Sequence, residues 1–190
     1  DDDCDIDIID VQIVAYRWGT QCTARTATPR SSTSVEQAAI LAVRPSTQTV
    51  TVGEVFTAGV VISDAVDLGA FEFTLGYSPT VEVITATVGP FLGSTGRTVV
   101  PAGTIISPTA GTVEFGAFTM GATPEGPDGD GLLATLTLRA LEEGEAELAF
   151  QGAQISNRAG NSQAIDAMLE GQLAIVPGQN VYLPLVLRQD

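Results

Sequence analysis

Acidic residues at the start of the chain have the spacing of a calcium-binding loop. The predicted ligands are Asp1, Asp3, Asp5, Asp7 and Asp10. Calcium takes oxygen ligands, and a twelve-residue loop that precedes a helix supplies them at alternate positions. With Asp10 at the last loop position, Asp5 supplies its carbonyl oxygen and the other four supply carboxylates. We therefore predict a calcium site in residues 1–10.

This loop departs from the usual pattern at two positions. Cys4 stands where the sharp turn favours Gly, and the last ligand is Asp10 instead of the longer Glu. A register that begins at Asp1 is less favourable, because it places Ile9 and Gln12 at the last two ligand positions. The alternative to a metal site is an acidic, solvated segment.

The residues that follow the loop predict a short amphipathic helix. Its apolar stripe recurs at i, i+3, i+4 and i+7 and consists of Val11, Val14, Ala15 and Trp18. Gly19 ends the pattern, and Asp10 is expected to cap its start. Such a short helix needs a partner surface, so we predict that the stripe makes contacts.

Cys4 and Cys22 are the only cysteines and flank the predicted helix. A disulfide between them would join the loop to the helix end and would fit an oxidising, extracellular setting. Two free thiols or a two-cysteine metal site are the alternatives.

Residues 5–18 resemble one calcium-loop-and-helix repeat of a dockerin. The resemblance is carried by Asp5-Ile6-Asp7-Ile8-Ile9-Asp10-Val11-Gln12-Ile13-Val14-Ala15-Tyr16-Arg17-Trp18. Dockerins normally carry two such repeats, and here there is one, incomplete at its start. The resemblance implies calcium-dependent docking through a helix face.

The rest of the chain predicts an all-β fold. Of 190 residues, 44% are hydrophobic, and 20 Gly and 10 Pro punctuate many short Val- and Thr-rich runs. Apolar and polar residues alternate with period two in residues 71–77, 113–117, 134–138 and 146–150. Further strands are expected at 39–43, at Val50 and Val52, at 55–62, at Val81, Val83 and Val88, and at 173–175, with a turn at Ser63-Asp64. A short helix over 35–40 is the alternative to the first of these strands. We predict an antiparallel β-sandwich over residues 35–176, after the N-terminal unit 1–22 and a polar linker 23–34.

The strands from about residue 36 to 176 resemble a cohesin domain. The segments that carry the resemblance are Val43-Arg44-Pro45, Val50-Thr51-Val52-Gly53-Glu54-Val55-Phe56, Leu68-Gly69-Ala70-Phe71-Glu72-Phe73-Thr74-Leu75-Gly76-Tyr77, Gly131-Leu132-Leu133-Ala134-Thr135-Leu136-Thr137-Leu138 and Gly171-Gln172-Leu173-Ala174-Ile175. The resemblance implies a nine-stranded jelly roll that binds a partner protein and catalyses no reaction.

Charge and composition exclude several classes of function. The net charge is −15, with no Lys, which argues against nucleic acid and anionic membranes as partners. No apolar run reaches the length of a transmembrane helix. Without His or Lys the usual catalytic bases are missing, and we interpret Glu72, Glu82 and Glu114 as outward strand residues instead of a glycosidase pair.

Two further segments suggest contacts of other kinds. Asp128 and Asp130, in the Gly- and Pro-rich run 125–131, have a spacing that suits calcium, although a tight turn uses the same residues. A carbohydrate-binding module would need exposed aromatic side chains, and only 6% of the residues are aromatic.

The C-terminal segment 177–190 contains a surplus strand pattern. Its aliphatic face consists of Val181, Leu183, Leu185 and Leu187. Pro184 suits an edge strand because it has no N–H. This strand either folds back through 177–180 onto its own sheet or adds to a neighbouring subunit, because an aliphatic strand left in water would aggregate.

Together these patterns predict a non-enzymatic, extracellular or cell-surface, calcium-binding assembly protein. Its contact elements would be the N-terminal helix and the C-terminal strand, which could join copies into a filament. The first alternative is a cohesin-type receptor for a separate dockerin-bearing protein, and the second is a carbohydrate-binding module.

Overall fold

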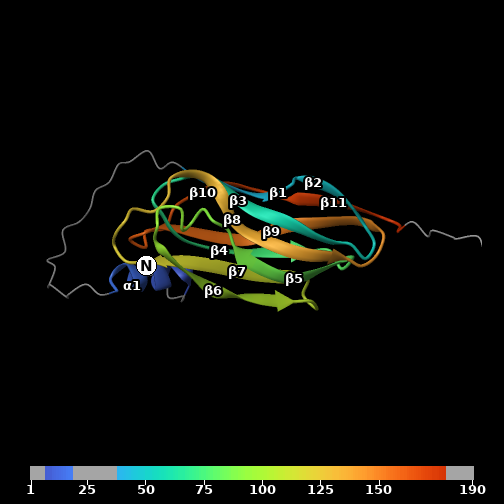
Figure 1. Cartoon of the computed structure of the whole chain (residues 1–190), viewed down its shortest axis with the longest axis horizontal. Helices are drawn as coiled ribbons and strands as arrows, with labels where there is room; N and C mark the ends of the chain where they lie inside the picture. The colour runs from blue at the N-terminus through green and yellow to red at the C-terminus, as the bar shows by residue number, and fades with distance from the viewer. Residues whose placement is uncertain (1–6, 19–37, 179–190) are drawn as a thin grey trace, which may run out of the picture.

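The computed structural model describes residues 7–18 and 38–178, which form a two-layered β-sandwich with one short helix at its end (Figure 1). The elements are α1 (Ile8–Tyr16), β1 (Ala39–Arg44), β2 (Thr47–Thr51), β3 (Val55–Ala65), β4 (Leu68–Tyr77), β5 (Val81–Val88), β6 (Thr98–Ser107), β7 (Thr112–Met120), β8 (Gly129–Ala140), β9 (Gly144–Asn157), β10 (Ile165–Leu169) and β11 (Gly171–Val176). In this part of the chain, no helix combines the length and the apolar composition needed to cross a membrane.

One sheet has five strands in the order β10-β1-β3-β8-β5, and the other has six in the order β2-β11-β9-β4-β7-β6. All pairings are antiparallel except β1 with β10 and β2 with β11. The chain changes sheets at Pro45, between β1 and β2. This arrangement confirms the predicted antiparallel jelly-roll sandwich, with eleven strands in place of nine.

The core lies between the two sheets and is built from the inward residues of the alternating strands. Phe71, Phe73 and Phe115 from β4 and β7 form a cluster with ring centroids 6.0 to 6.2 Å apart. Leu136 and Leu138 of β8 are fully buried opposite them. The period-two pattern therefore identified the inward faces of these strands correctly.

The longest strand, β9, spans the sandwich from one end to the other. At its start, Gly144 pairs with Ile175 near the end of β11. Just beyond its other end, the Arg158 carbonyl accepts a hydrogen bond from Gln12 of α1. The helix and the end of β11 consequently lie at opposite ends of the molecule, as Figure 1 shows.

Three features differ from the sequence prediction or were absent from it. The turn predicted at Ser63-Asp64 is a bulge within β3, where Asp64 has φ 60° and the register shifts between Ile62 and Ala65. β6 and β10 were not predicted, because both are exposed strands at the edges of the sheets. β6 also has a register shift between Pro101 and Gly103 that breaks its alternation.

Candidate protein-interaction surface

The helix α1 begins earlier than predicted. Asp7, not Asp10, is its N-cap: the Asp7 side chain accepts a hydrogen bond from the Ile9 amide at 2.8 Å. Asp10 completes a capping box by accepting from the Asp7 amide at 3.3 Å. The prediction that Asp10 caps the helix was therefore wrong, because Ile8 and Ile9 are buried and belong to the helix.

The helix packs on the outer face of the six-stranded sheet. Ile8 and Ile9 form a small cluster with Ala70 of β4 and Phe118 of β7, separate from the sandwich core. The face that α1 turns toward its own sandwich consists of Ile8, Ile9, Gln12 and Ala15. Of the predicted stripe, only Ala15 belongs to this face.

The other three residues of the stripe remain accessible. Val11, Val14 and Trp18 are 36%, 60% and 68% exposed. Val11 and Val14 on the nine-residue helix, together with Trp18 two residues beyond its end, form an open apolar contact surface. The structure is therefore compatible with the predicted contact role of the stripe, which remains a prediction.

Gln12 anchors the helix to the sandwich and was missed by the sequence analysis. It is fully buried, and its amide donates to the Arg158 carbonyl at 2.8 Å. Its carbonyl oxygen accepts from the Thr119 amide of β7 at 3.2 Å. The signal was present in the sequence, because Gln12 lies at i+4 from Ile8 and i−3 from Ala15 and thus on their face.

A close approach of the backbone supports this attachment. Gly160, in the turn after β9, has φ +81°, and an added Cβ would lie 2.2 Å from Ile13 Cγ1. At the other end of the helix, the Gly121 amide donates to the Ala15 carbonyl at 3.2 Å. Three segments that lie far apart in the sequence thus hold α1 in place.

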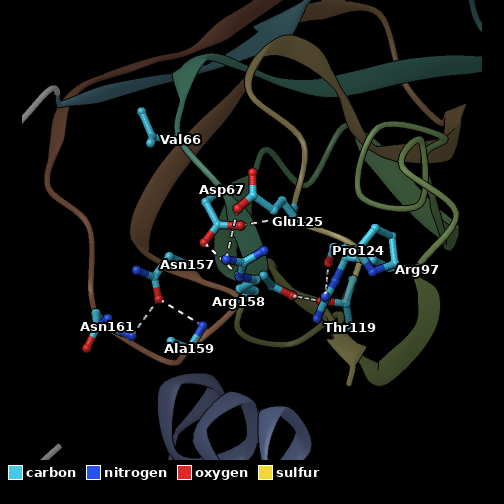
Figure 2. Close-up of polar contacts among 12 residues, drawn as sticks. Val66, Asp67, Arg97, Thr119, Pro124, Glu125, Asn157, Arg158, Ala159 and Asn161 are labelled. Carbon is cyan, nitrogen blue, oxygen red and sulfur yellow. Dashed lines mark hydrogen bonds and ion pairs between the residues drawn. The ribbon is translucent and has the colours of Figure 1, made fainter. Parts of the chain in front are cut away.

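A buried arginine organises the loops beside the helix. Arg97 is 5% exposed, and it donates to the Thr119 hydroxyl and to the carbonyls of Pro124 and Gly121 at 2.6 to 2.8 Å (Figure 2). Burial lowers the pKa of Arg97 from its ordinary value, and nearby Asp67 opposes that shift. Because Thr119 also bonds to Gln12, this cluster continues into the helix contact.

Arg158 forms the second half of this polar region. Its guanidinium lies 3.3 Å from Asp67 and 3.1 Å from Glu125 (Figure 2). Asp67 also accepts from the Gly126 amide at 2.7 Å. The loops that follow β3, β7 and β9 are therefore cross-linked at the end of the sandwich that carries α1.

The weaker calcium candidates serve as turn acceptors. Asp128 accepts from the Asp67 amide at 2.6 Å, and Asp130 accepts from the Asp64 amide at 3.0 Å. Within residues 7–18 and 38–178, no three acidic, histidine or cysteine side chains gather closely enough to hold a metal ion. These contacts match the turn alternative for this segment.

An apolar groove separates α1 from the edge of the six-stranded sheet. It encloses about 410 Å³ and is lined by Asp10, Val11, Val14, Ala15, Trp18, Val100, Phe118 and Met120. The first five come from the helix region, and the rest from outward positions of β6 and β7. The exposed stripe and the strand edge thus form one continuous apolar surface.

Beyond the helix, the same sheet face carries the half-buried Glu72 and Thr74 and the exposed Glu114, while Gly116 between them is buried. Thr74 and Glu72 of β4 lie beside Glu114 and Gly116 of β7 there. Burial raises the pKa of Glu72, and the charges of Asp7 and Glu114 raise it further. Glu82 lies on the other sheet in an exposed ion pair with Arg139. The three glutamates are on strand surfaces, as predicted, and do not converge.

The remaining predicted site residues lie outside the described residues. They are the calcium ligands Asp1, Asp3 and Asp5, the cysteines Cys4 and Cys22, and the C-terminal contact residues Val181, Leu183, Leu185 and Leu187. Calcium binding, the disulfide and the role of the C-terminal strand therefore stay predictions. The whole predicted linker 23–34 and residues 35–37 of the predicted sandwich also lie outside the described residues.

Comparison with known proteins identifies the sandwich. The family model described as "Cohesin domain" matches residues 41–174, more than half of the chain. No curated protein matches the sequence.

Solved structures with the same fold include three that cover most of this chain. One is a non-cellulosomal cohesin from the hyperthermophilic archaeon Archaeoglobus fulgidus, which is 20% identical with a TM-score of 0.57 over 73% of this chain and 91% of that one. A type II cohesin domain from the cellulosome of Acetivibrio cellulolyticus is 14% identical with a TM-score of 0.59 over 72% and 95%. A type I cohesin–dockerin complex from Clostridium thermocellum contains a chain that is 13% identical with a TM-score of 0.58 over 73% and 99%.

Proposed function

The chain belongs to the cohesin domain family, and from that premise we propose that it is a receptor module that binds a dockerin-bearing protein. The observation that carries the proposal is the family match over residues 41–174. Solved structures of the same fold include cohesins in complex with dockerins. This was the first alternative in the sequence analysis, and the comparisons favour it over self-assembly as the main function.

The proposed binding surface is the part of the outer face of the six-stranded sheet that lies beyond the helix. Thr74 has a short side chain there, so a partner helix can approach the strands closely. Glu72 and Glu114 supply acceptors for hydroxyl or basic groups of the partner. The accompanying role is non-enzymatic, because the described carboxylates do not pair in a cavity.

Binding by the full-length chain to two-repeat dockerin modules from its own source organism tests this proposal. We expect binding in calcium that is lost with a chelator, measured by titration calorimetry. Thr74→Arg should weaken it about tenfold or more by placing a bulky cation on the surface, whereas Thr57→Arg, on the outer face of the other sheet, should leave it unchanged. If no dockerin binds, or if Thr57→Arg is the damaging variant, the proposal is wrong.

Calcium-dependent self-assembly outside the cell is the second candidate. The observation that favours it is that Val14 and Trp18 of the stripe are largely exposed, at 60% and 68%. A calcium ion held by the N-terminal aspartates would neutralise part of the negative charge of a chain whose net charge is −15. Calorimetric titration of calcium into the full-length chain, with Asp1→Asn/Asp3→Asn as the variant, tests the metal site separately from the partner, because both residues are predicted to bind through their carboxylates. If the titration shows no heat of calcium binding, the predicted calcium site is excluded.

A further inference from the structure

The C-terminal residues outside the structure have the composition of a strand that needs an apolar site. Residues 179–187 carry no charged side chain, although the chain as a whole has a net charge of −15. Their alternating aliphatic residues would place Val181, Leu183, Leu185 and Leu187 on one face. An uncharged segment of this kind is the part of the molecule that a second copy can approach without charge repulsion.

The strand that leads into this segment has no free edge. β11 lies between β2 and β9 and pairs with both. A hairpin through 177–180 would have to displace one of these partners in order to pair with β11. A hairpin in which the C-terminal segment pairs with β11 of its own chain is therefore not available.

The apolar groove beside α1 is out of reach within one chain. The groove and the end of β11 are separated by β9, whose 14 residues span roughly 45 Å. Residues 179–181 span only about 10 Å when fully extended, and all of 179–190 span about 40 Å. The segment can occupy that groove only on another molecule.

The edge beside the groove is available for pairing. Among residues 7–18 and 38–178, β6 is the outermost strand of its sheet and has β7 as its single ladder partner. The outward side chain of Val100 on β6 lines the groove, opposite Val14 and Trp18 of α1. A strand added to β6 would have its backbone groups paired and its outward side chains next to an apolar hollow of about 410 Å³.

We propose that residues 181–187 of one copy add to the free edge of β6 on a second copy and place aliphatic side chains in the groove beneath Trp18. The donor segment follows the end of β11, which lies at the opposite end of the sandwich from the acceptor groove. The contact is thus heterologous, and its repetition joins copies head to tail. It uses the helix end of the sheet, so it is independent of the dockerin surface proposed around Thr74.

Sedimentation velocity on full-length variants tests this contact, with circular dichroism to verify folding. Leu183→Asp/Leu185→Asp alters the donor segment and Val14→Asp alters the acceptor groove. Each should weaken self-association about tenfold or more, because a carboxylate must be desolvated in an apolar site. Ile84→Asp is the matched control, because Ile84 is a similarly exposed aliphatic residue on the other sheet. Added salt should strengthen association of the unaltered chain by screening its negative charge.

A mixture of the two variants gives the decisive measurement. The Val14→Asp variant retains an intact donor segment, and the Leu183→Asp/Leu185→Asp variant retains an intact groove. Each should therefore be monomeric alone, while the mixture forms a one-to-one dimer. Trp18 is the only tryptophan, and its emission should shift to shorter wavelength in that dimer. A chain that is monomeric at about 100 µM, a segment variant that still assembles, or a mixture that stays monomeric would each overturn the proposal, whatever the result with dockerins.

Discussion

Replacing Gln12 by alanine should release α1 from the sandwich while the sandwich itself stays folded. The substitution removes the hydrogen bonds that Gln12 makes to the Arg158 carbonyl at 2.8 Å and the Thr119 amide at 3.2 Å. The Thr119 amide is buried, so losing its acceptor costs about 1–3 kcal/mol, and the lost carbonyl bond costs about 1 kcal/mol more. The better helix propensity of alanine returns only about 0.4 kcal/mol.

The net destabilisation of the docked helix is therefore roughly 1.6–3.6 kcal/mol, which corresponds to a rise of about 15- to 450-fold in its opening equilibrium. Hydrogen exchange measured by mass spectrometry should show this rise for residues 8–16. If the free energy that holds α1 on the sandwich is smaller than the loss caused by Gln12→Ala, the helix should lose its protection entirely. The sandwich strands should keep their protection, because Ile8 and Ile9 pack in a cluster outside the main core.

Val14→Ala is the matched control on the same helix. Its side chain is 60% exposed, and its removal should change helix exchange by less than about threefold. If Gln12→Ala also changes exchange by less than about fivefold, the two buried hydrogen bonds do not hold the helix. The account of how α1 is attached would then be wrong.

Three further substitutions should act on the sandwich. Arg97→Ala leaves the Thr119 hydroxyl and two carbonyls without their donor and should lower the free energy of unfolding by about 2–4 kcal/mol in urea titrations, whereas Arg139→Ala, in an exposed ion pair, should change it by less than about 1 kcal/mol. Phe73→Ala should cost about 3–5 kcal/mol in the same titration, because it opens a cavity in the aromatic cluster; a loss below 1 kcal/mol would contradict that packing. Because the pKa of Glu72 is raised in the folded state, the native protein binds its proton more tightly than the unfolded chain does, and stability is lost as pH rises above 4.5. Glu72→Gln should therefore be more stable than the parent at pH 7, with a difference that shrinks below pH 4.5, and an equal effect at both values would refute this assignment.

The fold could be predicted from the sequence because most strands have one face in the core. Phe71, Phe73 and Phe115 alternate with polar residues, so both the strand and its inward face were readable. β6 and β10 could not be recognised in this way. Neither strand has a buried residue, so no apolar face alternates along it, whereas the edge strand β5 buries Val81 and Val83 and shows that alternation.

The surface was harder to predict than the core. The stripe of α1 was recognised because it is apolar, but only Ala15 of its four residues is buried against the sandwich. The face that does touch it contains Gln12, whose amide is satisfied by groups more than 100 residues away. No local pattern reveals such partners. The Arg97 cluster was missed for the same reason, since its acceptors are backbone carbonyls brought together only by the folded loops.

The positions of the two ends of the sandwich also determine how it responds to a pulling force. β1 begins where Ile40 pairs with Ser63, toward the end that carries α1, and β11 ends at the opposite side. Tension between Ala39 and Val176 therefore acts along the strand axes. The ladder bonds that join β1 to β3 and β11 to β9 run across those axes, so the force loads them together in shear. A domain loaded in this way resists extension until many bonds break at once, which suits a link in a chain under mechanical stress.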